Sequence, residues 1–134
     1  MDFLIAAQDI GVMSLGLLND RGELTEETFP IAPEQYLQTI HLFLEKYHVL
    51  FEDIKRILVV PGPGSFTASR VSVTIANTIA FTHKIPMVSL PNVEKYSLQE
   101  LCVRFLQSDQ QETVFVTPLY DRPPMITQAK TQVL

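Results

Sequence analysis

Short hydrophobic runs separated by polar turns dominate the first thirty residues of the chain. Residues 3–7 and 12–18 are largely apolar, whereas residues 23–29 are polar and rich in threonine and glutamate. Residues 19–22, Asn-Asp-Arg-Gly, form a typical turn sequence. This pattern predicts three strands in an antiparallel meander. The third strand is expected at a sheet edge, where its charged side chains discourage pairing with other chains.

An amphipathic helix is predicted next. Pro33 and Glu34 suit a first helical turn, because proline already has the helical φ and a carboxylate is favoured at the positive end of the helix dipole. Apolar residues then recur at helical spacing as far as Tyr47, which predicts a helix over residues 33–48. The side of this helix away from the apolar stripe carries Gln38, His41, Leu42 and Glu45.

The pattern changes again at residues 57–67, Ile-Leu-Val-Val-Pro-Gly-Pro-Gly-Ser-Phe-Thr. Four apolar residues bounded by Pro and Gly are typical of a buried strand. The prolines fix φ and the glycines Gly62 and Gly64 permit positive φ, so a sharp turn follows. Ser65 or Thr67 can then cap the next helix. The turn is either a rigid connection or an anion site at a helix N-terminus. No lysine follows the glycines, which excludes a P-loop and favours the rigid connection.

Residues 66–83 are predicted to form a long helix with two stripes. Residues 71–75 alone alternate like a strand, but the whole segment is longer than a normal strand. One stripe consists of Ala68, Val71, Ile75, Ile79 and Thr82. The other consists of small residues, with Val73 beside it: Ser69, Ser72, Ala76 and Ala80. Small residues let another helix approach closely, so we expect one stripe on the sheet and the other against a helix.

The remaining pattern predicts a strand, a helix and a short final strand. Residues 84–90 indicate a turn and a strand, and Asn92 is placed to cap a helix that continues to about Leu106. Cys102 falls in the apolar stripe of that helix and is expected to be a buried small hydrophobic residue. Residues 113–117 predict a strand before a proline-containing tail. The predicted order is βββαβαβα plus a short C-terminal strand, an α/β fold with a mixed sheet and helices on its faces.

Composition narrows the classes of function. A chain of 134 residues with 46% hydrophobic content is one domain's worth of globular protein. A net charge of −5 argues against a protein that binds nucleic acid strongly by itself, which needs a basic surface. The single cysteine excludes a disulfide framework and fits a reducing cytoplasm. The sequence has no apolar run of membrane-spanning length and no basic start typical of a signal peptide. We therefore expect a soluble, cytoplasmic protein without membrane contact.

No set of residues stands out as a catalytic or metal centre. His41 and His48 are seven positions apart, whereas metal sites on helices use the i, i+4 spacing. His83 lies near a predicted helix end, where a cation is favoured in any case. Since neither a carboxylate pair nor a nucleophile–base pair is recognisable, we expect no catalytic residue, no metal and no cofactor.

Residues 62–67, Gly-Pro-Gly-Ser-Phe-Thr, followed by Arg70, resemble the GPGSFTGLR signature of the TsaB (YeaZ) family. That family is the non-catalytic relative of the TsaD enzyme in bacterial synthesis of threonylcarbamoyladenosine (t6A) on tRNA. Residues 118–122, Pro-Leu-Tyr-Asp-Arg, are similar to the Pro-x-Tyr-Leu-Arg near the C-terminus of the family. The chain departs from the family at residues 7–9, where Ala-Gln-Asp stands in place of Asp-Thr-Ser, and at residues 68–69, where Ala-Ser replaces Gly-Leu.

The resemblance implies a single RNase H-like (ASKHA, actin-like ATPase) lobe over residues 1–107. Residues 108–134 would then be a remnant of a second lobe with a short strand and an extended tail. The implied function is a non-catalytic, cytoplasmic subunit that docks on a TsaD-like paralogue, together with a P-loop ATPase of the TsaE type.

The resemblance further implies that the docking helices are residues 33–48 and 66–83, and a homodimer through the same helices is the related possibility. The expected partner-binding residues are Gln38, His41, Leu42, Glu45, Ser69, Ser72, Val73, Ala76 and Ala80. Two alternatives come from other classes. One is a small nucleotide-binding enzyme of actin-like ATPase fold that holds phosphate in the turn at residues 62–65. The other is a self-associating binding module unrelated to tRNA modification.

Overall fold

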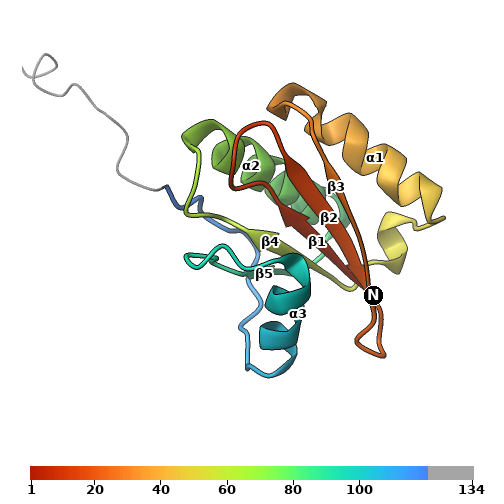
Figure 1. Cartoon of the computed structure of the whole chain (residues 1–134). Coiled ribbons are helices and arrows are strands. Elements are labelled where there is room, and N and C mark those ends of the chain that lie inside the picture. The colour runs from red at the N-terminus through yellow and green to blue at the C-terminus, as the bar shows by residue number, and fades with distance from the viewer. Residues whose placement is uncertain (121–134) are drawn as a thin grey trace, which may run out of the picture.

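A computed structural model describes residues 1–120 of the chain (Figure 1). A mixed five-stranded sheet forms its centre, with helices on both faces. In chain order the elements are β1 (Asp2–Ala6), β2 (Met13–Leu18), β3 (Leu24–Phe29), the 3-10 turn η1 (Pro33–Gln35), α1 (Tyr36–Lys46), the 3-10 turn η2 (Phe51–Asp53), β4 (Arg56–Val60), α2 (Phe66–His83), β5 (Met87–Ser89) and α3 (Leu98–Leu106).

The strand order across the sheet is β3-β2-β1-β4-β5. The β1–β2 and β2–β3 pairs are antiparallel, as expected for a meander, and the β1–β4 and β4–β5 pairs are parallel. In the central strand, Phe3 lies opposite Leu17 of β2 on one side and Ile57 of β4 on the other. The polar strand β3 lies at an edge, which confirms its predicted place.

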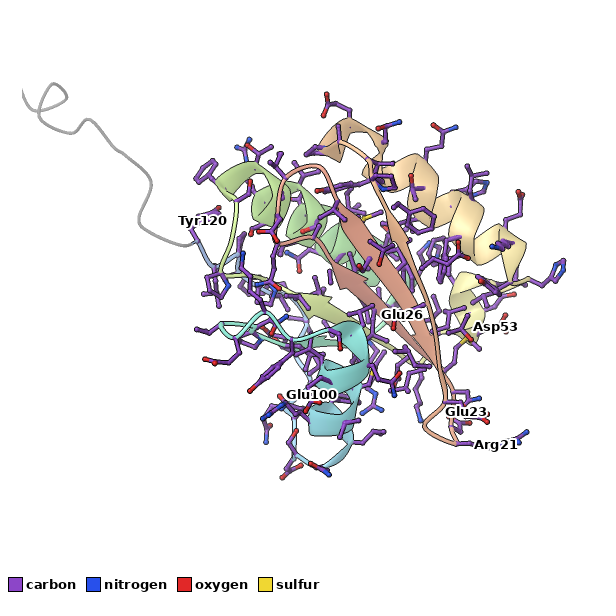
Figure 2. All side chains as sticks on the ribbon, in the orientation of Figure 1. Arg21, Glu23, Glu26, Asp53, Glu100 and Tyr120 are labelled. Carbon is purple, nitrogen blue, oxygen red and sulfur yellow. The ribbon has the colours of Figure 1, made fainter. Side chains whose placement is uncertain are left out.

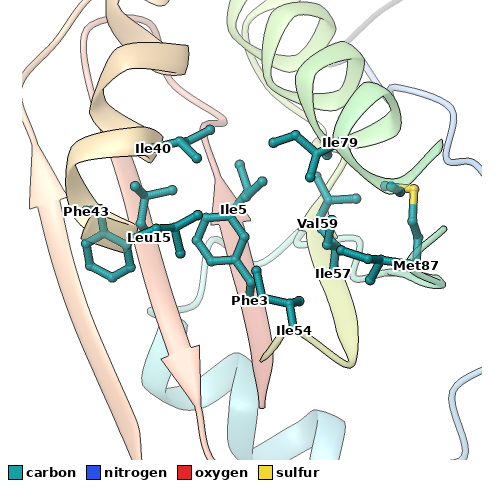
Figure 3. Close-up of a cluster of buried hydrophobic side chains, with 14 of the residues drawn as sticks. Phe3, Ile5, Leu15, Ile40, Phe43, Ile54, Ile57, Val59, Ile79 and Met87 are labelled. Atoms are coloured by element: carbon teal, nitrogen blue, oxygen red, sulfur yellow. The ribbon is translucent and has the colours of Figure 1, made fainter. Parts of the chain in front are cut away.

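Two hydrophobic cores lie on opposite faces of the sheet. Because side chains alternate along a strand, Phe3 and Ile5 of β1 face α1 and α2, while Leu4 between them faces α3. The larger core, drawn in Figure 3, includes a stacked pair of rings from Phe3 and Phe43, with centroids 6.2 Å apart. The smaller core joins Leu4 and its neighbours to the apolar face of α3. Burial of these apolar surfaces is the main force that holds the helices on the sheet.

The C-terminal part of the fold differs from the sequence prediction in two places. Asn92 does not cap a helix. The helix α3 begins only at Leu98, where the Ser97 side chain accepts a hydrogen bond from the backbone N–H of Glu100 at 3.2 Å. The strand predicted over residues 113–117 is reduced to one isolated antiparallel bridge between Thr113 and Met87.

Cys102 lies in the smaller core, as predicted from its place in the stripe of α3. Burial raises the pKa of its thiol to about 11, with smaller contributions from the Glu26 and Asp2 carboxylates. Because only the thiolate is an efficient nucleophile, we expect Cys102 to remain unmodified by a thiol reagent at pH 8 in the folded chain and to react at once in denaturant. Thiol titration with and without denaturant tests this. Rapid modification of the native chain would show that α3 does not cover this residue.

The part of the chain that the structure describes contains no helix that is long and apolar enough to cross a membrane.

Candidate functional site

Three loops meet at the carboxyl ends of the parallel strands, which is the usual place for a ligand site in an open α/β sheet. The first loop follows β1 at Gln8, the second follows β4 at residues 61–65, and the third follows β5 at Asn92. The strands bring together three segments that are spread over more than eighty residues of the sequence. This group of loops is called the loop cluster below.

Gln8 joins the other two loops of the cluster. Its side-chain N–H donates to the carbonyl oxygens of Pro63 and Asn92, both at 2.8 Å, and its side-chain oxygen accepts from the amide of Asn92 at 2.9 Å. The backbone N–H of Ser65 donates to the Gln8 carbonyl at 2.6 Å, and that of Asn92 donates to the Gly62 carbonyl at 2.8 Å. The polar groups of the cluster are thus paired with one another, which stabilises a fixed arrangement of the three loops.

Gln8 and Asn92 were not predicted as a pair from the sequence. The sequence marks Gln8 only as one of the residues that stand in place of the family's Asp-Thr-Ser, and it predicts Asn92 as a helix cap. The Asn92 side chain does act locally, because its oxygen accepts from the Tyr96 N–H at 2.8 Å and its amide donates to the Tyr96 carbonyl at 2.9 Å. Asn92 is buried, and a buried polar residue needs such partners. The signal that would have found them is a polar residue two or three positions after the end of each of two buried strands.

The turn residues serve two different steric needs. Gly62 has a φ of +130°, and a Cβ atom there would collide with the carbonyl oxygen of Leu119. Gly64 does not have positive φ, so the predicted reason for that glycine is wrong; a Cβ atom there would collide with the backbone of Gln8. Ser65 caps α2, as predicted, by accepting from the Ala68 N–H at 3.3 Å, while Thr67 lies exposed in the first turn. The turn therefore has a clear role as a rigid connection.

A small cavity of about 170 Å³ lies beside the loop cluster, between β1, β2 and the start of α3. Small-molecule sites usually enclose about 300–1,000 Å³, so this cavity is below their size. An ion pair between Lys95 and Asp9, at 2.7 Å, is part of its lining. In residues 1–120, no group of three or more His, Cys, Asp or Glu side chains is arranged to hold a metal ion.

The helix pair α1 and α2 presents a second candidate site. An open groove of about 470 Å³ runs between the two helices. Leu37 and Leu42 on α1 are 60% and 51% exposed. The four α1 residues predicted to bind a partner, Gln38, His41, Leu42 and Glu45, are all exposed. The groove is lined by Leu37, Gln38, Ile40, His41, Phe51, Thr78, Ile79, Thr82 and His83.

The α2 residues predicted to bind a partner lie on the opposite side of that helix. All five are at most 2% exposed, and Val73, Ala76 and Ala80 belong to the core between α2 and the sheet. Their side chains cannot contact a partner while the chain is folded in this way. The small stripe lets α2 lie close to the sheet, instead of close to another protein. The buried residues are Ser69, Ser72, Val73, Ala76 and Ala80.

Threonine side chains form the exposed side of α2 instead. Thr74, Thr78 and Thr82 recur every four residues and are all exposed, while Val71 and Ile75 beside them are half-buried against the core. Thr78 and Thr82 also line the groove. A protein that docks on the helix pair would therefore touch these threonines on α2 and the exposed leucines on α1.

The position of α1 is fixed by a carboxylate on the neighbouring edge strand. Glu27 of β3 accepts hydrogen bonds from the Lys46 ammonium at 2.8 Å and from the Tyr47 hydroxyl at 2.6 Å. These bonds, the one from Lys46 first, lower the pKa of the Glu27 carboxyl. Because the pKa of Glu27 is lower in the folded chain than in the unfolded chain, its ionised carboxylate stabilises the fold at any pH above the unfolded-state pKa. This stabilisation is lost as the pH falls through the folded-state pKa. The contact keeps the end of α1 on the sheet at neutral pH.

Comparison with known proteins identifies the family. The family model for "TsaD: tRNA N6-adenosine threonylcarbamoyltransferase" matches residues 33–104, which is more than half of the chain. The chain belongs to the TsaD family. The matched region includes both helices of the groove, the turn at residues 62–65 and most of α3.

Individual relatives match over shorter regions. The tRNA threonylcarbamoyladenosine biosynthesis protein TsaB of Bacillus subtilis is 33% identical over 58 residues, which is 43% of this chain and 25% of that protein. A tRNA N6-adenosine threonylcarbamoyltransferase of Bacillus thuringiensis is 30% identical over 81 residues, 58% of this chain and 24% of the relative. The matches thus span about a quarter of the length of these relatives.

Among solved structures, YeaZ from Pseudomonas aeruginosa superposes with a TM-score of 0.59 at 20% identity, over 67% of this chain and 44% of YeaZ. This likeness confirms the predicted fold, a single RNase H-like α/β lobe. Together with the family match, it makes the chain a TsaB/YeaZ-like member of the TsaD family that corresponds to part of its longer relatives.

Proposed function

We propose that this chain is a non-catalytic, TsaB-like subunit that docks on a TsaD-like enzyme in t6A modification of tRNA, with a TsaE-type ATPase as a further partner. The observation that carries this proposal is the open groove between α1 and α2, with exposed leucines along one of its helices. The proposed contact is a four-helix one, in which two helices of the partner lie along α1 and α2.

The composition of the groove supports a protein partner. Single exposed leucines are common on protein surfaces, whereas adjacent apolar groups around a hollow mark interaction sites. Leu37 contributes to this groove, and Leu42, which is not part of its lining, is exposed on a more outward side of α1 that a second pair of helices would also cover. Phe51 and His83, whose rings stack with centroids 4.3 Å apart, add to its lining. Apolar and neutral polar groups can be buried by another helix pair without leaving an unpaired charge.

The loop cluster supports the non-catalytic part of the proposal. Gln8, Asn92 and the turn at residues 62–65 use their polar groups on one another. A phosphate would have to replace these internal hydrogen bonds before it could be bound there. Ala7, which is buried, has no carboxylate to offer a metal–nucleotide complex at the end of β1.

The first variant to test is Leu42→Glu. Placing a carboxylate on the exposed side of α1, within the proposed four-helix contact, should weaken binding to a TsaD-like partner by about 100-fold or more, since an unpaired charge would be desolvated there. Leu106→Glu is the matched control, because Leu106 is similarly exposed, at 55% against 51% for Leu42, but lies on α3 at the other face of the sheet. Calorimetric titration of the partner with each folded variant measures the difference.

Each alternative function gives a different result in the same experiments. Equal binding by Leu42→Glu and the unmodified chain would place the interface elsewhere. A stable homodimer that Leu42→Glu dissociates, without any affinity for a TsaD-like protein, would favour the self-associating module. Nucleotide-dependent thermal stabilisation that is lost on changing Ser65 would favour a small nucleotide-binding enzyme.

A further inference from the structure

Residues 113–120 run back along the lobe as an extended segment, here called the strap. The strap follows a polar connection after α3 and reaches from the edge strand β5 to the turn at residues 61–65. Within the strap only Thr113 forms a bridge with a strand of the sheet. Its remaining contacts are with a helix side chain, a turn, an aromatic ring and the hydrophobic core, which Val116 enters.

The first contact is with the edge of β5. The backbone N–H of Thr113 donates to the Met87 carbonyl at 2.7 Å, and the Met87 N–H donates to the Thr113 carbonyl at 2.9 Å. β5 is a sheet edge, so its backbone groups are available to an added extended chain. This is the geometry by which many domains bind peptides.

The second contact is made by Asn77 of α2. Its carboxamide donates to the Val116 carbonyl at 2.9 Å and accepts from the Val116 N–H at 2.8 Å, so one side chain satisfies both backbone groups. The Val116 side chain is buried in the core on this face of the sheet. By contrast, Val114 and Phe115 are 81% and 61% exposed. The lobe thus holds the main chain of the strap and one of its apolar side chains.

The third contact is with the turn. The Leu119 N–H donates to the Pro61 carbonyl at 2.8 Å, and the Leu119 carbonyl lies where a Cβ atom on residue 62 would be. Tyr120, labelled in Figure 2, stacks on Phe66 in the first turn of α2, with ring centroids 4.6 Å apart. Gly62 is therefore required where the strap crosses the turn.

We propose that the lobe contains a groove for an extended peptide, and that the strap is its built-in ligand. The groove consists of the Met87 edge, the Asn77 carboxamide, the Pro61 carbonyl and the Phe66 ring. Its ligand is an extended segment with a small apolar residue three positions after the strand-paired residue and an aromatic residue four positions further on. Most of its contacts are to main-chain atoms, so a segment of another chain with this pattern would fit the same groove. The proposal does not depend on the proposed function.

A cut chain tests this directly. A protease recognition sequence replaces residues 108–112 in the full-length chain, and the purified, folded protein is then cleaved. We expect the C-terminal fragment to remain bound after cleavage and to be displaced by an excess of a synthetic peptide of residues 113–120. Asn77→Ala should weaken retention of the fragment about tenfold or more, because two hydrogen bonds to Val116 are lost. Thr78→Ala, next to it on α2 and exposed, should leave retention unchanged.

Hydrogen exchange of the uncut chain provides a second measurement that requires no variant. A bound ligand segment should open as one unit, so the amides of Val116 and Leu119 should exchange at a common rate, faster than those of the central strand β1. Exchange of these amides only on global unfolding would show that the strap is an integral part of the core. Loss of the fragment on cleavage, or equal retention by Asn77→Ala and Thr78→Ala, would also overturn the proposal.

Discussion

Ala76→Arg is expected to unfold the chain, not merely to block a partner. Ala76 is 0% exposed and belongs to the core between α2 and the sheet. An arginine there would have to push the helix away from β4 or bury an unpaired charge, at a cost of about 4 kcal/mol or more. Such a loss is comparable with the whole stability of a small domain. Thermal unfolding followed by circular dichroism measures it.

Thr78→Arg is the matched control for this substitution. It introduces the same side chain on the same helix, but at an exposed position whose hydroxyl bonds only within the helix. We expect Thr78→Arg to fold with nearly unchanged stability and to lose binding to a TsaD-like partner. If Ala76→Arg remained folded while Thr78→Arg unfolded, the orientation of α2 on the sheet would be wrong.

Gly64→Ala is expected to cause the second large effect, a loss of roughly 2–4 kcal/mol of stability. The cause is a collision, because the added Cβ would meet the carbonyl group of Gln8. Gln8 cannot retreat freely, since its side chain is tied to Pro63 and Asn92. Denaturant unfolding of the variant and the unmodified chain gives the difference in free energy.

Gly11→Ala separates collision from backbone strain. Gly11 has a φ of +89°, but a Cβ atom there would meet nothing within 4 Å. Its substitution should cost only the strain of a left-handed alanine, about 1–2 kcal/mol. A loss of stability for Gly64→Ala that is no greater than that for Gly11→Ala would contradict the close approach of Gln8 to the turn.

The main features of the lobe could be predicted from the sequence because they depend on local pattern. Short apolar runs and turn residues indicated β1 to β3, and the largely β-branched run ending in Pro-Gly-Pro-Gly indicated β4 and the start of α2. Ser65 was correctly expected to cap α2. The GPGSFT motif added the family, which composition and periodicity alone do not specify.

The orientation of α2 could not be predicted in the same way. The helix has apolar or small residues on most of its circumference, so periodicity does not decide which side meets the sheet. The small stripe was expected to face a partner, but it lies against the core. Threonine is β-branched and can be either buried or exposed, so the sequence does not show that the threonines of α2 are exposed. Only the packing of α2 on the sheet shows which side of the helix is buried and which is exposed.

The features at the C-terminal end depended on contacts between distant residues. Asn92 is a good helix cap by type, but its partners include Gln8, more than eighty residues away. Residues 113–117 have the composition of a strand, but only Thr113 pairs with the sheet. The backbone groups of Val116 form their hydrogen bonds with the side chain of Asn77 instead of with a strand. Neither partner lies near enough in the sequence for a local pattern to reveal it.

The proposed function requires a TsaD-like enzyme to dock on the groove between α1 and α2. Hydroxyl-radical footprinting of the chain, free and in complex with a TsaD-like protein, tests it most directly, because the oxidation rate of each side chain reports its exposure. We predict strong protection of Leu37 and Leu42 in the complex, with unchanged oxidation of Leu106 on α3 and of Phe81 beyond the groove. Unchanged oxidation of Leu37 and Leu42 in a complex that demonstrably forms would contradict the claim.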